Sequence, residues 1–198
     1  MIGSSKKWIE AGYELFAKDG PEGINVERLA KILDLNKSGF YHYFGDREIF
    51  LYELRDYHHQ EMNNFYNEIS FLRCFVPDYL NLLIKYQTSF FVQMQLRRHE
   101  NLPIFKDAFD VVKEKTEKKC LRLWATYINL PVNDPAALKL WKILGDVFFM
   151  RLTPEKMNLE FMRGMTEDVR EIVFKIQQNA VIVNKPFSVI RPQPQVRI

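Results

Sequence analysis

The sequence predicts an all-α protein with a small helical unit at the N-terminus and a larger helical bundle behind it. Apolar residues recur at helical spacing along nearly the whole chain, and no alternating run bounded by turn residues occurs before the last eighteen residues. Short periodic segments fill the first part, whereas long amphipathic segments separated by prolines and Asn/Asp clusters follow Pro77. With 198 residues, 47% of them hydrophobic and 27% charged, the chain has enough material for a buried core.

Three helices are expected in the first part of the chain. The first, about residues 6–19, has one apolar side and ends at the Gly-Pro pair 20–21. Asn25 is a suitable N-cap for a short second helix. The apolar stripe of that helix is Val26, Leu29, Ala30 and Leu33. After a break at residues 34–36, a third short helix is expected over 37–44. Two short helices joined by a three-residue turn and supported by a longer one form the helix-turn-helix arrangement.

The third helix has two different faces. Phe40 and Phe44 fall on one side as anchors. The other side carries side chains that can reach base edges or phosphates, namely Lys37, Ser38, Tyr41 and His42. Gly39 costs about 1 kcal/mol in a helix interior, and a close approach of the backbone to a DNA duplex would explain it. A helix-turn-helix that only packs against other helices is the alternative.

Net charge alone does not identify a nucleic-acid binder here. The whole chain carries a formal charge of +3. Residues 1–57 contain eight Lys or Arg against ten Asp or Glu, which gives a local net charge of −2. A DNA-binding interpretation therefore depends on the local arrangement of the basic residues and not on bulk electrostatics.

A connector helix and four bundle helices are expected after the first unit. Their ranges are about 47–70, 78–98, 104–129, 135–152 and 158–178. The last two carry apolar residues in alternating steps of three and four, the spacing of a helix-packing seam, and each has a second apolar edge. One edge can pack within the subunit and the other against a second copy, so a homodimer is predicted, with a thicker monomeric core as the alternative. The expected interface residues are Leu138, Trp141, Gly145, Phe148, Met162, Met165, Val169, Ile172 and Ile176.

The stretch from Trp8 to Tyr57 resembles the DNA-binding domain of TetR/AcrR-type transcriptional regulators. The resemblance includes the first helix with its Gly20 stop and the segment NKSGFYHYF, which matches a tyrosine-x-tyrosine-phenylalanine signature through Tyr41, Tyr43 and Phe44. Further matching residues are Ile9, Ala11, Leu15, Phe16, Leu29 and Ala30, and Arg47 and Glu48 stand where the family usually has lysine and glutamate. Three positions depart from the family pattern. Gly12 replaces an alanine and is expected to weaken the first helix slightly, Asp34 replaces a turn glycine, and Asn25 replaces a threonine cap.

The resemblance implies a role for each part of the chain. Residues 1–57 would bind DNA, residues 58–180 would bind an effector and dimerise, and residues 181–198 would form an extended tail. Lys37, Ser38, Gly39 and His42 would enter the major groove, whereas the phosphates would be held by Asn25, Tyr41, Tyr43 and Arg47. Lys6 and Lys7 would touch the flanking backbone. A homodimeric repressor would then bind a pseudo-palindromic operator and be released by a small molecule.

The effector is expected to be apolar or aromatic, because the middle of the chain is rich in aromatic residues. The residues named as a pocket are Phe65, Tyr86, Phe90, Phe109, Trp124 and Tyr127. A filled core is the alternative for each of them. The runner-up function is a helical module that binds a small molecule or a protein without reading DNA sequence.

No enzyme, cofactor or metal site is predicted. The chain lacks the nucleophile-elbow, phosphate-loop, dinucleotide-binding and zinc-protease motifs. The neighbours His58 and His59 lie on different faces of a helix and do not form a ligand pair at i, i+4. Cys74 and Cys120 are expected to be core thiols. No apolar run reaches the length of about 18 residues needed to span a membrane, and the start is not a signal sequence, so a cytoplasmic location is expected.

Overall fold

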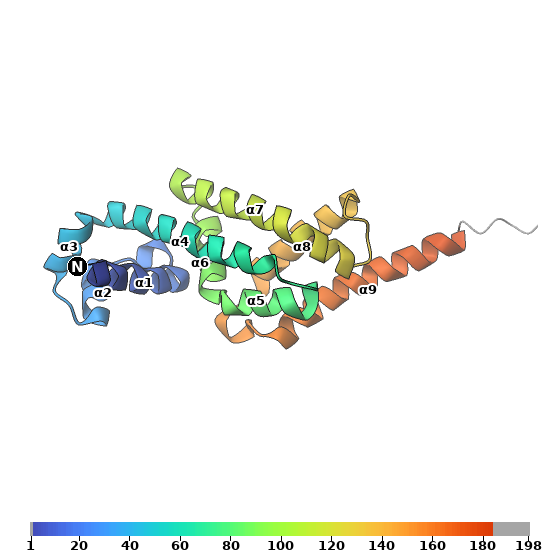
Figure 1. Cartoon of the computed structure of the whole chain (residues 1–198), viewed down its shortest axis with the longest axis horizontal. Coiled ribbons are helices and arrows are strands. Elements are labelled where there is room, and N and C mark those ends of the chain that lie inside the picture. Colours follow the sequence, from blue (N-terminus) through green and yellow to red (C-terminus); the bar gives the residue numbers. More distant parts are fainter. Residues whose placement is uncertain (1, 184–198) are drawn as a thin grey trace, which may run out of the picture.

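Helices make up the regular structure between residues 2 and 183, the part of the chain that the computed structural model describes, with side chains over residues 5–179. No strand occurs in that range, so the all-α prediction is confirmed. Figure 1 shows an elongated molecule with α1, α2 and α3 at one end and the C-terminal half of α9 projecting from the other.

The first three helices form the expected helix-turn-helix unit, here called the head. They are α1 (Ile2–Asp19), α2 (Val26–Leu33) and α3 (Lys37–Phe44), with a short 3₁₀ turn, Pro21–Gly23, after α1. The side chain of Asn25 accepts a hydrogen bond from the Arg28 amide and caps α2, as predicted. Asp34 ends α2 in the left-handed conformation (φ 53°, ψ 47°), which aspartate tolerates better than most residues.

The remaining helices form the body. They are α4 (Arg47–Ile69), α5 (Leu80–Lys85), α6 (Gln87–Arg98), α7 (Pro103–Tyr127), α8 (Pro135–Arg151) and α9 (Leu159–Val183), with a π-helical turn at Phe75–Tyr79 and a 3₁₀ turn at Pro154–Lys156. The long helix α4 runs from the head into the body (Figure 1). Asp46 caps it by accepting from the Ile49 amide at 2.8 Å.

Three predicted element boundaries need correction. The single helix expected over 78–98 is broken at Tyr86, which leaves helical geometry (φ −101°, ψ 30°) while its hydroxyl donates to Glu68 on α4 at 2.7 Å. The residues after the break include Thr88 and Ser89, which are weak helix formers. Helix α1 begins at Ile2 instead of residue 6. Helix α9 reaches Val183, so the predicted tail begins as helix, and residues 184–198 lie outside the described part.

The head and the body share one apolar core. It contains Trp8, Phe16, Phe40 and Phe50 together with residues of α6 and α7. The α6 and α7 members are Val92, Leu96, Phe105, Ala108 and Phe109. A second core lies entirely within the body, around Phe75, Trp124 and Met162. Cys120 is buried there as predicted, whereas Cys74 is only half-buried, which corrects its assignment as a core thiol.

Polar contacts reinforce the joint between head and body. Gln95 on α6 donates from its amide nitrogen to the carbonyls of Ala17 and Lys18, each at 3.3 Å, at the end of α1. His99, just beyond α6, lies 3.0 Å from the carboxylate of Glu22 in the turn after α1. Carbonyls at a helix end have no partner within the helix, so α6 supplies the donors that α1 lacks.

Gly12 has a packing role that its residue type did not reveal. A Cβ atom at this position would lie 2.4 Å from Cζ of Phe50 and 2.7 Å from Cε1 of the same ring. Phe50 is fully buried and holds Phe40 and Phe44 at ring distances of 5.0 and 4.8 Å. The glycine therefore allows α4 to approach α1, and the expectation that it merely weakens the first helix was incomplete.

Candidate functional site

Helix α3 presents the polar surface that the sequence predicted. Phe40 is fully buried, with its ring 5.5 Å from that of Trp8, and this contact fixes the orientation of the helix. Lys37, Ser38 and His42 are exposed, and Tyr41 keeps 51% of its surface exposed. Lys37 lies on the same helical stripe as Phe40 and Phe44 but at the first turn, where it reaches Glu27 on α2. A Cβ atom at Gly39 would meet no atom within 4 Å, so packing within the subunit does not require this glycine.

Two of the exposed side chains already have partners on the head. The Lys37 ammonium donates to Glu27 on α2 at 3.0 Å, and this contact lowers the pKa of the Glu27 carboxyl below its ordinary value. The hydroxyl of Ser38 donates to the side-chain oxygen of Asn36 at 3.0 Å, and the same oxygen caps α3. Because both contacts are exposed, a nucleic acid can displace them at small cost.

Arg47 differs most from its expected role. Its Nε donates to the Ile24 carbonyl at 2.8 Å, and its Nη2 donates to the Pro21 carbonyl. The guanidinium thus fastens the turn between α1 and α2 to the start of α4, and Nη1 is the nitrogen not used in those two bonds. The family resemblance implies that this residue contacts a phosphate. Spacing along the chain does not show which loop carbonyls come within its reach.

The remaining predicted DNA contacts lie around the same end of the molecule. Lys7 is exposed on α1, and Lys6, also exposed, lies 3.6 Å from Glu10 on the same helix. Tyr43 is half-buried. The side-chain oxygen of Asn25 is used in the α2 cap, which leaves its amide group for an external acceptor.

A cavity of about 410 Å³ lies in the body, between α4, α6, α7 and α8. Phe65, Tyr86, Phe90 and Phe109 line it, as expected. The other two predicted residues, Trp124 and Tyr127, do not line it. They pack around Phe75 in the body core, with ring distances of 5.1 and 5.5 Å, which corrects their assignment to the pocket.

Several residues of the cavity wall were not predicted from the sequence. Trp141, Phe148 and Phe149 of α8 line it, together with the polar residues Ser89 and Gln93 of α6. The first two aromatic residues stood in the predicted packing seam, and nothing in their spacing separates a cavity wall from a seam. Ser89 and Gln93 are one helical turn apart, a signal that could have been noticed had the break at Tyr86 been predicted.

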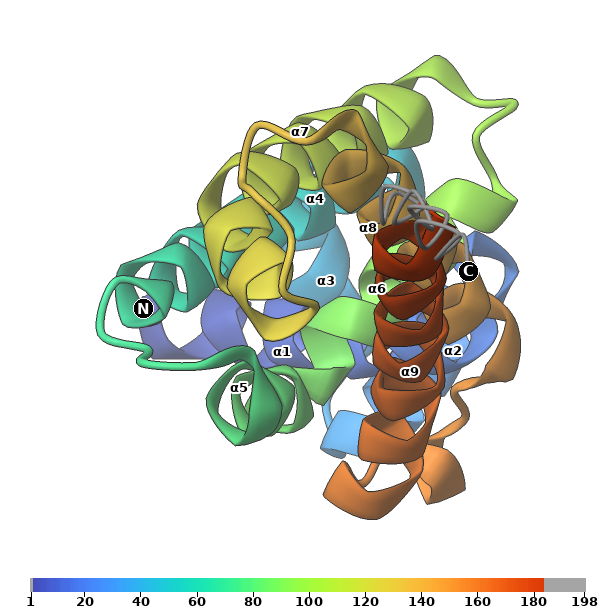
Figure 2. The same ribbon diagram turned by 90° about the vertical axis from the view of Figure 1, so that its right-hand side faces the viewer.

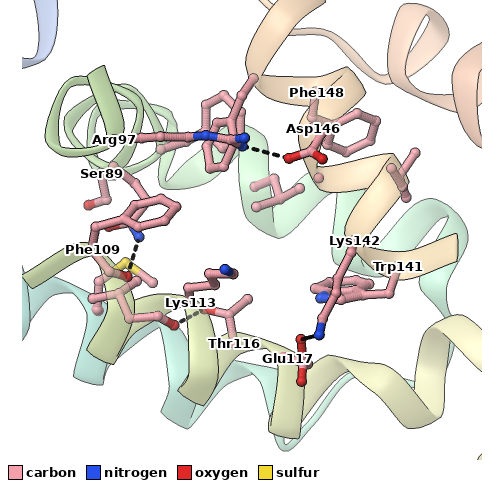
Figure 3. Close-up of a pocket in the computed structure, with 18 of the residues that line it drawn as sticks. Ser89, Arg97, Phe109, Lys113, Thr116, Glu117, Trp141, Lys142, Asp146 and Phe148 are labelled. Atoms are coloured by element: carbon pink, nitrogen blue, oxygen red, sulfur yellow. Dashed lines mark hydrogen bonds and ion pairs between the residues drawn. The ribbon is translucent and has the colours of Figure 1, made fainter. Parts of the chain in front are cut away.

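Charged side chains surround the aromatic part of the cavity (Figure 3). Arg97 donates to Asp146 at 2.7 Å, and Lys142 lies 3.9 Å from Glu117. Lys113 lies 5.8 Å from the centre of the Phe109 ring. These pairs join α6 and α7 to α8, so the rim is largely neutralised by its own ion pairs.

A buried chain of hydrogen bonds connects the cavity wall to the head. Gln93 donates from its amide to the Phe109 carbonyl at 2.9 Å, and its oxygen lies 3.0 Å from Nε2 of His58. Nδ1 of His58 lies 2.7 Å from the hydroxyl of Tyr13 on α1, which lies 3.0 Å from the hydroxyl of Ser89. Complete burial lowers the pKa of His58 to about 4. No group of three potential metal ligands occurs among the described residues.

The predicted dimer seam divides into two sets of residues. Phe148, Met162 and Met165 are buried inside the subunit, and Trp141 faces the cavity, so these four have little side-chain area left for a partner. Half-buried Leu138, Gly145 and Val169 and exposed Ile172 and Ile176 do retain surface. A heptad-like spacing could not distinguish the inner edge of α8 and α9 from the outer one, because both edges are apolar.

Comparisons with known proteins agree with this arrangement. Residues 9–54 match the family model described as "Bacterial regulatory proteins, tetR family". A crystal structure of a transcriptional regulator (TerR/AcrR family) from Aquifex aeolicus VF5 has a similar fold, with a TM-score of 0.54 and 16% sequence identity, over 86% of this chain and 98% of that one. No curated protein sequence matches the chain significantly. None of the described helices is both long enough and apolar enough to cross a membrane.

The described chain therefore combines a helix-turn-helix head with an all-helical body, the arrangement of the structure it resembles. The match over residues 9–54 covers α2, α3 and the start of α4, where the predicted DNA contacts of those helices lie. Residues 9–54 thus carry a domain that matches the regulatory proteins of the TetR family, and the fold of the described chain resembles that of a regulator from the TerR/AcrR family.

Proposed function

We propose that this protein is a cytoplasmic transcriptional repressor that binds a pseudo-palindromic operator as a homodimer and is released by a small molecule. The observation that carries the proposal is that α3 buries Phe40 and Phe44 in the head and leaves Lys37, Ser38 and His42 exposed. The buried face holds the helix rigidly on Trp8 and Phe50, so the exposed face is available to enter the major groove. Residues 1–57 and 58–180 are the proposed DNA-binding and effector domains.

The exposed apolar residues of α8 and α9 support the homodimer. Ile172 and Ile176 are 57% and 63% exposed on α9, and Ile143 on α8 is 53% exposed. The C-terminal half of α9 extends beyond the rest of the body in Figure 1, and in Figure 2, where this end faces the viewer, α9 lies in front of the other helices. A second copy that packs on this edge would cover these side chains and would place two α3 helices on the same side of the assembly. The substitution of Ile172 and Ile176 together by Glu is expected to give a monomer in sedimentation equilibrium.

The cavity supports the effector part of the proposal. Its volume lies within the range of about 300 to 1,000 Å³ that is typical of small-molecule sites, and aromatic side chains from the four helices α4, α6, α7 and α8 line it. Helices α4 and α6 contact both the cavity and the head. A ligand that binds more tightly to one position of these helices relative to the head would therefore change the affinity of the protein for DNA.

The deciding experiment is fluorescence anisotropy with the DNA that flanks the protein's own gene and with a scrambled duplex, each at two salt concentrations. Preferential binding that weakens with salt, at two protomers per site, is the expected result. The substitutions Lys37→Ala and His42→Ala should abolish the preference while the protein stays dimeric. Equal weak binding to both duplexes, followed by a random-sequence selection that enriches nothing, would refute sequence reading and favour a helical module that binds only a small molecule or a protein.

A further inference from the structure

The inner end of the cavity is polar and is connected to the head. Ser89 and Gln93 lie one turn apart on α6, and their exposed fractions are only 2% and 7%. Both line the cavity, whereas their hydrogen-bond partners Tyr13 and His58 do not. A group of the ligand that reaches this wall therefore contacts the first members of a chain that ends on α1.

The donor and the acceptor of each hydrogen bond in this network can be assigned by starting from the Phe109 carbonyl. The Phe109 carbonyl can only accept, so the amide nitrogen of Gln93 faces it and the amide oxygen faces His58. An amide oxygen also only accepts, so Nε2 of His58 must carry a proton. Burial lowers the pKa of His58 to about 4, and the imidazole is therefore neutral at pH 7, with a lone pair on Nδ1.

Tyr13 has one hydroxyl proton and two neighbours. With a lone pair on Nδ1 of His58, that proton is donated to the imidazole across 2.7 Å. Heavy-atom geometry alone assigns Tyr13 as the donor in the 3.0 Å contact with Ser89. Because the single Tyr13 proton is already donated to His58, we infer that the serine hydroxyl donates to the phenol oxygen instead. The reverse arrangement, in which Tyr13 donates to Ser89, requires Nδ1 to donate to Tyr13 and therefore a charged imidazolium in a fully buried place.

Ser89 and Gln93 can each form one further hydrogen bond, one as acceptor and the other as donor. The Ser89 hydroxyl donates its proton to Tyr13, and its oxygen keeps lone pairs that can accept a hydrogen bond. The Gln93 amide nitrogen has donated one proton to Phe109 and keeps a second one. A hydroxyl group can donate to the first and accept from the second. An ether can only accept, and a carboxylate has no proton to give to Ser89.

We propose that the cavity binds a hydroxylated aromatic molecule, whose hydroxyl group donates to Ser89 and accepts from Gln93 while its ring lies among the aromatic side chains. The inference rests on the proposed role of the cavity as an effector site and names the class of ligand. Donation to Ser89 strengthens the donation from Ser89 to Tyr13, because hydrogen bonds in a chain polarise one another. Tyr13 is thus a positioning residue for the ligand although it lies outside the cavity wall.

The test compares four probes of similar shape by isothermal titration calorimetry on the full chain: 2-naphthol, 2-methoxynaphthalene, 2-methylnaphthalene and 2-naphthoate. The naphthol is expected to bind about tenfold more tightly than the methoxy and methyl compounds, since only it makes both hydrogen bonds. The probe 2-naphthoate tests whether Lys113 holds the ligand instead, through an ion pair with its carboxylate. Tighter binding of 2-naphthoate than of 2-naphthol, equal binding of the naphthol and its methyl ether, or no binding of any probe would overturn the assignment.

Two variants separate the hydrogen-bond chain from general effects on the cavity. Ser89→Ala should reduce the preference for the naphthol to within about twofold. Tyr13→Phe should lower naphthol affinity about threefold and leave 2-methylnaphthalene affinity unchanged, although Tyr13 does not touch the ligand. The control is Thr116→Val, which removes another hydroxyl of the cavity wall and should leave the preference intact. Circular dichroism establishes that each variant is folded.

The protonation of His58 has its own spectroscopic test. A long-range proton–nitrogen NMR spectrum at pH 7 should show His58 as the Nε2–H tautomer, and an Nδ1–H tautomer or an imidazolium would contradict the inferred direction of the chain. None of these measurements uses DNA. A protein that prefers the naphthol but reads no operator would refute the repressor proposal alone, whereas a specific operator binder without this preference would refute only the ligand class.

Discussion

Substitution of Gly12 by alanine tests how the head is packed. Alanine is a better helix former than glycine by about 1 kcal/mol, so helix propensity alone predicts a more stable protein. The added Cβ atom, however, would lie 2.4 Å from Phe50, whose ring is fully buried between α1 and α3. Overpacking of a well-filled core costs about 1 to 3 kcal/mol, and the contacts of Phe50 with Phe40 and Phe44 leave its ring little room, so the upper part of that range applies.

The expected net result is a loss of about 2 kcal/mol in the free energy of unfolding, measured by urea denaturation followed at 222 nm. The matched control is Gly164→Ala on α9, where a Cβ atom would meet nothing within 4 Å and where stability should rise by about 0.5 to 1 kcal/mol. If Gly12→Ala proves as stable as the wild type, the close approach of α1 and α4 does not depend on this glycine.

Three further predictions concern the proposed DNA-binding surface around α3 and the buried His58. Gly39→Ala should keep or raise the stability of the protein, because no atom lies within 4 Å of its Cβ position. The same substitution should weaken operator binding at least about tenfold if the backbone of α3 approaches DNA closely. Unchanged affinity in fluorescence anisotropy would contradict that approach. Glu27→Gln should raise operator affinity about threefold, because it frees Lys37 from an exposed ion pair; lower affinity would show that the pair orients Lys37 for binding. The pKa of His58 is about 4 in the folded protein and about 6.5 in the unfolded protein. Between pH 6.5 and pH 4 the unfolded state therefore binds more protons than the folded state, and the free energy of unfolding falls as the pH drops through this range. The loss between pH 7 and pH 5 should be about 2 kcal/mol larger than in His58→Gln, and equal pH profiles in urea titrations would refute the buried neutral imidazole.

The sequence predicts the helices of this protein better than their surroundings. The caps at Asn25 and Asn36 and the left-handed Asp34 follow from residue type and local spacing, and the structure has all three. The roles of Gly12, Arg47 and Phe148 depend on which neighbour each one meets in space. Local pattern cannot supply that information, since the same glycine or apolar residue serves equally well on a free face, in a core or beside a cavity.

The sequence likewise predicts some residues of the two candidate sites and not others. The exposed residues of α3 could be listed from helical periodicity, because a short amphipathic helix has one inner and one outer face. Four of the six predicted pocket aromatics line the cavity, but Trp124 and Tyr127 do not. Ser89 and Gln93 were not predicted, because a polar residue type on a helix gives no sign that the side chain is buried.

The core shared by α1, α6 and α7 limits how far this protein can be treated as a set of exchangeable modules. Trp8 and Phe16 are buried against the same cluster as Leu96 and Phe105, so the α1 surface and the α6 surface are complementary halves of one interface. A chimera that received only the proposed DNA-reading helix α3 would keep this interface, whereas one that received a whole foreign head would lose it. Engineering of new operator specificity therefore has α3 as its natural unit of transplantation.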